Sequence, residues 1–149
     1  MLVVALIAGA CNGDDAADDT GPSGGTANDS VSNACPADGC RITIVDVTRE
    51  GDELAITWEA NFAPDVSRNH IHVYWDIYTA DQVSSDAEAQ GTTQGEWVPT
   101  DADPRFVTES EVSVANRGTS TTVCVTAGNR DHAVVDSALF DCRDVSGQL

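Results

Sequence analysis

The chain has 149 residues with 25 Asp or Glu, 7 Arg and no Lys, so its formal net charge is −18 at pH 7. Such a charge repels phosphate and argues against a nucleic-acid partner or binding to anionic lipid headgroups. The length suits one small domain, and 5 cysteines in so short a chain favour disulfides and an oxidising compartment.

The first eleven residues carry a targeting pattern. Residues 2–10 (LVVALIAGA) are all apolar or small, and Cys11 follows them directly. The run is shorter than the roughly 20 apolar residues that a membrane-spanning helix needs. It resembles the signal of bacterial lipoproteins, which implies a signal peptide over residues 1–10, lipidation of Cys11 and anchoring to a membrane of the cell envelope, outside the cytoplasm. The alternative is a plain secretory signal and a secreted protein.

A polar segment follows the signal. Residues 12–34 consist almost entirely of Asp, Gly, Ser, Thr, Ala and Asn, with no aromatic residue. Such a composition buries too little apolar surface to offset the entropy lost on ordering. We therefore expect a disordered acidic linker over residues 11–34 and a folded domain over residues 35–149.

From residue 41 onward, apolar and polar residues alternate as they do in half-buried strands. We expect strands over residues 42–47, 54–58, 70–78, 96–98, 106–108, 112–114, 121–126 and 138–145, with an irregularity in the first near Asp46. Thr79, with Gln82 three residues later, predicts the cap of a short helix over residues 80–88. Several short strands separated by turn residues predict an all-β fold, an antiparallel β-sandwich.

Three of these strands resemble fibronectin type III domains. Residues 54–58 (LAITW) match that family's second strand, residues 71–75 (IHVYW) its third, and residues 121–129 (TTVCVTAGN) its sixth. The similarity spans about residues 41–146. It implies an immunoglobulin-like sandwich, and the family mostly serves as a spacer or binding module.

If Cys11 carries lipid, four cysteines remain, and three pairings of them are formally open. Residues 35–40 (CPADGC) form a short turn bounded by two cysteines, which favours Cys35–Cys40. If Val123 and Val125 face the core, Cys124 points the other way, and Cys142 lies opposite it on the strand that returns. Facing residues of antiparallel strands are about 4.5–5.5 Å apart, so we predict a Cys124–Cys142 disulfide.

Three histidines are the candidate metal ligands. His70 and His72 are two residues apart on a predicted strand, so their side chains project from the same face. In an immunoglobulin-like sandwich, the loop that follows the sixth strand lies at the end where the third strand begins, which brings His132 to them. Imidazoles bind zinc and copper, and Asp131 or Asp65 is a candidate carboxylate ligand. The alternative is a solvated outer face that binds no metal.

The same face of the third strand carries Tyr74 and Tyr78, and the four side chains form a polar aromatic stripe. An exposed stripe of this kind suits contact with a protein or a glycan, although packing against the neighbouring strand is the alternative. The sequence has no nucleophile motif and no phosphate-binding glycine loop, so we expect no enzyme. The predicted function is a membrane-anchored binding or spacer module of the cell envelope; the alternative is a metal-binding envelope protein.

Overall fold

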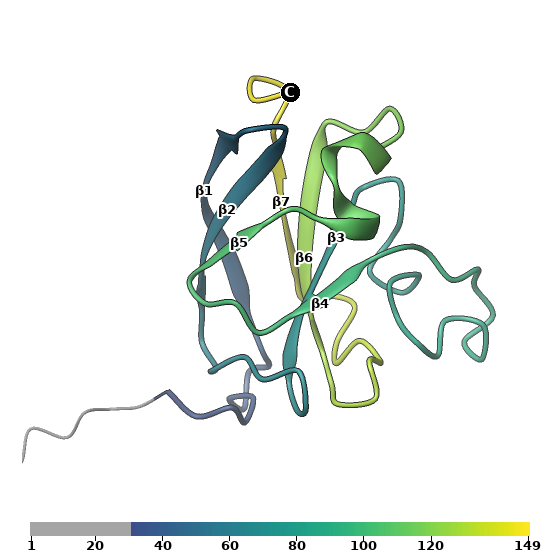
Figure 1. The fold of residues 1–149 in the computed structure, drawn as a ribbon. Coiled ribbons are helices and arrows are strands. Elements are labelled where there is room, and N and C mark those ends of the chain that lie inside the picture. The colour runs from purple at the N-terminus through teal and green to yellow at the C-terminus, as the bar shows by residue number, and fades with distance from the viewer. Residues whose placement is uncertain (1–30) are drawn as a thin grey trace, which may run out of the picture.

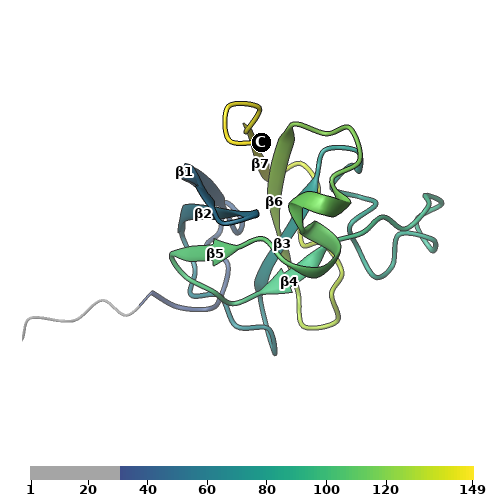
Figure 2. The same cartoon turned by 45° about the horizontal axis from the view of Figure 1, so that its top comes forward.

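The computed structural model describes residues 31–149, so the predicted signal peptide, Cys11 and most of the predicted linker lie outside the described residues. Two antiparallel sheets pack face to face (Figures 1 and 2). The first has the order β1 (Ile42–Glu50), β2 (Glu53–Ala60), β5 (Arg105–Val107); the second has the order β4 (Val98–Thr100), β3 (His70–Trp75), β6 (Thr122–Gly128), β7 (Phe140–Asp144). The prediction of an all-β antiparallel sandwich is confirmed.

The core lies between the two sheets and is built by the predicted alternation. The inward side chains of the three central strands are all buried: Leu54, Ile56 and Trp58 on β2, Ile71, Val73 and Trp75 on β3, Val123, Val125 and Ala127 on β6. Trp58 stacks on Phe106 of β5, with ring centroids 6.1 Å apart. Each large apolar side chain buried in this way contributes about 1.5–3 kcal/mol to stability. Burial of these side chains therefore determines which face of β3 points to the core and which points away from it.

Both predicted disulfides are present. Cys35–Cys40 closes a turn with Cα atoms 4.6 Å apart, and Cys124–Cys142 joins directly paired residues of β6 and β7. The predicted irregularity in β1 is a register shift between Ile44 and Asp46. The alternation of β6 therefore places Cys124 as expected, on the face opposite to the core.

Contacts of the domain begin before Cys35. The Asn33 side-chain amide donates to the carbonyls of Ala63 and Asn69 at 2.6 and 2.8 Å, and Ala63 N–H donates to Ser32 O at 3.0 Å. The last residues of the predicted linker are thus attached to the loop that leads into β3. A composition typical of disorder does not reveal such contacts, because they come from single polar groups.

The connection between β3 and β4, residues 76–97, contains no helix, so the predicted helix over residues 80–88 is wrong. One of the two capping contacts forms, from Thr79 N–H to Gln82 Oε1 at 3.0 Å, but Gln82 N–H donates to the Thr79 carbonyl and only turns follow. The next residues direct their polar groups to the rest of the domain instead: Ser85 N–H donates to His132 O, and Val134 N–H donates to Ser84 Oγ. These tertiary hydrogen bonds replace those of a helix.

This connection covers the outer face of the second sheet (Figures 1 and 2). Val83 packs with Tyr74 and Cys124 in a second, smaller apolar cluster. His70, His72 and Tyr74 are therefore buried, and the predicted exposed stripe is wrong. The third strand also ends at Trp75, three residues earlier than predicted.

The strand predicted over residues 112–114 is wrong as well. Two short 3₁₀ turns, Ser110–Val112 and Val114–Asn116, occupy this stretch. The Glu53 carboxylate accepts hydrogen bonds from Ser113 Oγ, Thr108 Oγ1 and Val114 N, which bends the chain around β2.

Among the described residues, no helix is long and apolar enough to span a membrane.

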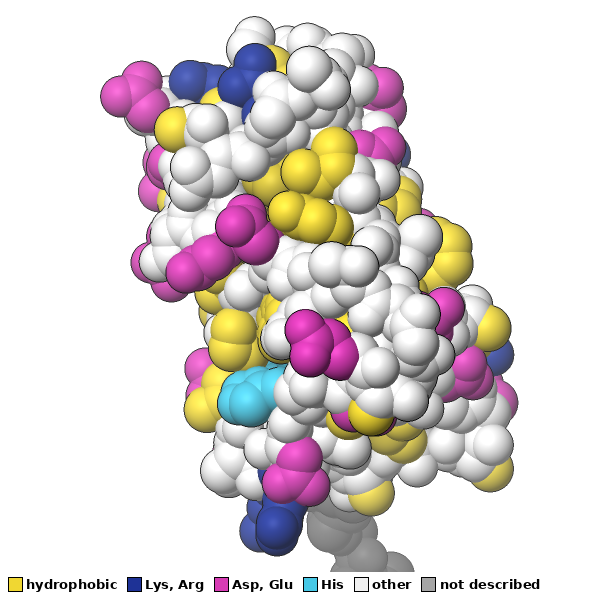
Figure 3. All heavy atoms as spheres, turned by 90° about the vertical axis from the view of Figure 1, so that its right-hand side faces the viewer, with side chains coloured by type: hydrophobic (Ala, Val, Ile, Leu, Met, Phe, Trp, Pro, Cys, Tyr) yellow, Lys and Arg dark blue, Asp and Glu magenta, His cyan; other side chains and the backbone are white. Residues whose placement is uncertain are grey.

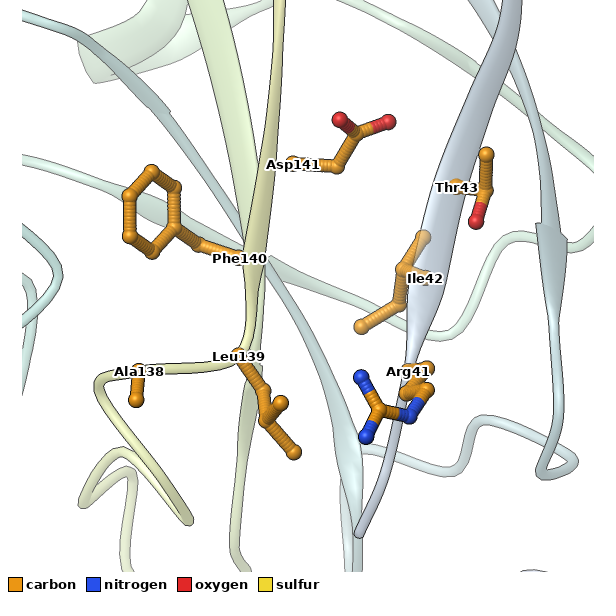
Figure 4. A pocket seen from close by; sticks show the side chains of 7 residues that line it. All are labelled: Arg41, Ile42, Thr43, Ala138, Leu139, Phe140 and Asp141. Carbon is orange, nitrogen blue, oxygen red and sulfur yellow. The ribbon is translucent and has the colours of Figure 1, made fainter. Parts of the chain in front are cut away.

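The edges of the two sheets meet along β1 and β7. Ile44 N–H donates to Asp141 Oδ2 at 2.7 Å, and Arg143 donates to the carbonyls of Ile44 and Val45. At one end of this seam a hollow opens between Ile42 and the pair Leu139 and Phe140 (Figure 4). Side-chain to backbone bonds thus hold the sheet edges together where no strand pairing does.

Candidate metal centre

Two of the three histidines are fixed by the pairing of β3 with β6. His70 pairs with Gly128 and His72 with Thr126, near the end of β6. Because Ile71 and Val73 occupy the core face, both imidazoles project from the opposite face, under the connection of residues 76–97. Both side chains are fully buried.

His132 comes from the turn that follows β6. The Asn129 side chain organises this turn by accepting hydrogen bonds from Asp131 N and Ala133 N at 2.9 and 3.1 Å. His132 has φ 61°, a left-handed conformation that residues other than Gly seldom adopt. Its carbonyl accepts a hydrogen bond from Ser85 N at 2.8 Å, which joins the turn to the covering segment. The turn thus holds His132 over the end of β3.

The three imidazoles meet, as strand alternation and sandwich topology predicted. His70 Nε2 lies 3.0 Å from His72 Nε2 and 3.0 Å from His132 Nδ1. All three ligand atoms lie within 4.8 Å of one another. A tetrahedral ion with Zn–N bonds of about 2.0–2.1 Å needs nitrogens about 3.3 Å apart, so the two short distances must lengthen slightly and the third must shorten for the three nitrogens to bind one ion.

Backbone carbonyls fix the protons on two of the rings. His72 Nδ1 lies 2.7 Å from Val83 O, and His70 Nδ1 lies 3.2 Å from Arg68 O. A carbonyl oxygen only accepts, so in the tautomer that satisfies both carbonyls each Nδ1 carries the proton of its neutral ring and each Nε2 presents a lone pair. In this tautomer the two Nε2 atoms, 3.0 Å apart, are both acceptors. A histidine that binds a metal through one ring nitrogen usually donates from the other to a carbonyl or carboxylate.

Burial keeps these imidazoles neutral. It lowers the pKa of His72 from 6.5 to about 3, although the hydrogen bond to Val83 O acts in the opposite direction. Burial also lowers the pKa of His70, again against the effect of the Arg68 carbonyl. A metal binds only unprotonated imidazole, so both nitrogens are available as ligands at neutral pH.

Neither predicted carboxylate joins the three histidines. The Asp65 carboxylate accepts from Ser67 N and Ser67 Oγ, and that of Asp131 pairs with Arg130 on the surface. Within residues 31–149, the group of side chains placed to share one ion consists of the histidines alone. The expected His set is therefore assembled, and the expected carboxylate is not.

Three neighbours of the cluster were not predicted. Val83 supplies the carbonyl for His72, and Trp97 lies over the same imidazole with ring centroids 5.3 Å apart. Gly128 lies directly against His72, since a Cβ atom at this position would be 2.3 Å from His72 Nε2. A glycine at the end of a strand looks like an ordinary turn residue in the sequence, so nothing there marks its role.

Comparison of the chain with protein-family models, with curated proteins and with solved structures finds no match.

Proposed function

We propose that this protein is a metal-binding module of the cell envelope that holds one zinc or copper ion on His70, His72 and His132. The observation that carries the proposal is the convergence of three imidazole nitrogens, with His70 Nε2 3.0 Å from both His72 Nε2 and His132 Nδ1. Two acceptors at this distance repel each other, and a cation between them removes the repulsion. Because the depressed pKa values disfavour a proton as that cation, a metal ion is the better candidate.

The ligand chemistry narrows the choice of ion. Imidazole nitrogen suits zinc and copper, whereas magnesium and calcium prefer oxygen ligands. The net charge of −18 favours the approach of any cation. Three of the four side chains of the stripe that suggested a protein or glycan partner are buried, so the metal-binding alternative replaces contact with such a partner as the better supported function.

The proposal also includes the location of the protein in the cell envelope and its resemblance to fibronectin type III domains. The run of residues 2–10 before Cys11 supports a lipid anchor outside the cytoplasm. The first, second and fifth strands share one sheet, and the third, sixth and seventh are neighbours in the other, which supports an immunoglobulin-like sandwich of the fibronectin type III kind. On this proposal, the linker displays the metal-binding domain at the membrane surface.

Metal titration tests the proposal. Cys11 is the one cysteine outside the two disulfides, and a free thiol would itself bind zinc, so the full chain with Cys11→Ser is the appropriate background. Calorimetry with Zn²⁺ and with Cu²⁺ should show one site per chain, with affinity at least about 100-fold weaker in His132→Ala.

The matched control for this experiment is Asp131→Ala. It alters the adjacent exposed residue, whose carboxylate stands outside the cluster, and it should leave the affinity unchanged. His132 is the ligand to vary because it is only half-buried, so its loss spares the core. Equal affinity of the parent protein and His132→Ala would overturn the proposal.

A further inference from the structure

We infer that the bound metal keeps one coordination position open toward the surface beside His132, and that this position takes a neutral, planar nitrogen donor of the imidazole class. The inference rests on the proposed function, because it concerns the same ion. Its first observation is the number of ligands. Three imidazoles are supplied by the described residues, whereas zinc and copper(II) take four or more ligands. Three protein ligands with a free position are typical of metal sites that bind an exchangeable ligand.

The burial of the ligands shows where the open position lies. His70 and His72 are fully buried, with Val83 and Trp97 packed over their face of the sheet. His132 alone of the three retains exposed surface. A ligand from solvent therefore approaches on the His132 side, and this is where His surface is visible among hydrophobic side chains (Figure 3).

A groove of about 390 Å³ begins at His132, and we call it the Trp97 groove. Trp97 and Pro99 give it an apolar, flat lining, and Glu96 and Glu111 contribute the charge. Among the described residues that line it, none is an Arg. The groove offers a planar ligand a surface to stack on and offers an anion no partner.

The charges decide between classes of ligand. A carboxylate or another anion that enters the groove is repelled by Glu96 and Glu111, against its attraction to the metal. A neutral imidazole also binds the metal, is not repelled by the two glutamates and packs on Trp97. Free imidazole compounds and the His side chain of a peptide share this chemistry, so the two sources are separate arms of the test.

The test uses the full chain with Cys11→Ser, loaded with Co²⁺ in place of zinc, because the visible absorption of Co²⁺ reports its coordination. Imidazole, the neutral peptide acetyl-Gly-His-Gly-amide and sodium azide are titrated separately, and bound cobalt is measured after desalting. We expect a saturable spectral change with imidazole, with azide at least about tenfold weaker and cobalt retained. The Glu96→Gln/Glu111→Gln variant should bind azide more tightly and imidazole with unchanged affinity. The difference between the two affinities should therefore become smaller.

The outcomes separate this inference from the proposed function. If neither imidazole nor the peptide changes the spectrum while cobalt stays bound, the site is closed. This result overturns the inference but not the proposed metal site. Azide binding as tight as imidazole overturns the assigned ligand class. A protein that binds no cobalt, no zinc and no copper overturns the proposed function together with the inference. Binding of imidazole and peptide supports a His side chain as the ligand, and binding of imidazole alone supports a free heterocycle.

Discussion

Gly128→Ala should damage the proposed metal centre without removing a ligand. The new Cβ atom would lie 2.3 Å from His72 Nε2 and 2.7 Å from His72 Cε1, far inside contact distance. The backbone cannot retreat, because Gly128 pairs with His70 on one side and with Val134 on the other. The His72 ring must therefore move, although Val83 O holds its Nδ1 at 2.7 Å and Trp97 covers it.

Two magnitudes follow from this clash. Overpacking of a buried site costs about 1–3 kcal/mol, and the displaced ring also weakens a hydrogen bond to a buried carbonyl, so we expect the metal-free variant to be about 2 kcal/mol less stable. Displacement of one nitrogen of the proposed site should weaken zinc binding about 10- to 100-fold, as the loss of a hydrogen bond that orients a ligand does.

Denaturant titration of the metal-free protein and zinc calorimetry measure these two effects. Gly147→Ala is the matched control, because a Cβ atom there has no neighbour within 4 Å and the same substitution should change neither quantity. Zinc affinity of Gly128→Ala equal to that of the parent protein would refute the reasoning, since His72 would then not bind metal in the position described.

Three further outcomes are expected. Between about pH 7.5 and about pH 5 the metal-free protein should lose about 2 kcal/mol of stability through His72, because His72 takes up a proton below pH 6.5 when unfolded but only near pH 3 when folded. Denaturant titrations in chelator measure this loss, and His72→Phe should reduce the pH dependence to the part that His70, whose pKa is also lowered, contributes. The double variant Cys124→Ala/Cys142→Ala opens a loop of 18 residues and should lower stability by about 3 kcal/mol. An unchanged melting temperature would contradict this prediction. Cys11→Ser should move the protein from membranes to the soluble fraction, and the intact mass of the parent protein should show acyl chains on Cys11; a soluble parent protein would contradict lipidation.

The sequence predicted the parts of the site that depend on strand alternation and topology. The alternation in residues 71–75 assigned Ile71 and Val73 to the core, and hence His72 to the opposite face. The same reasoning on β6 placed Cys124 opposite Cys142. Sandwich topology then brought His132 to the start of β3, because the loops at one end of such a fold are neighbours in space.

The burial of the site could not be predicted in the same way. Polar residues on one face of a strand are typical of a solvated face, and periodicity alone does not show that another segment covers it. The cover formed by residues 76–97 is held by single backbone groups, such as the Val83 carbonyl and the Ser85 amide, which leave no pattern in the sequence. The contact of Gly128 with His72 depends on packing in three dimensions and is equally invisible there.

The buried positions of His70 and His72 lower the stability of the fold, and this favours a functional role for both residues. The face that carries His70 and His72 is closed by Tyr74, Val83 and Trp97, so apolar side chains would pack there without opposed lone pairs and without a depressed pKa. Stability alone therefore favours other residues at both positions. The main core lies on the other face of β3 and does not depend on them, so the metal-free sandwich can fold with the site in place. A ligand that binds only the folded state then recovers the lost free energy in proportion to its affinity, which is the behaviour expected of a preformed metal site on a fold that does not need the metal to form.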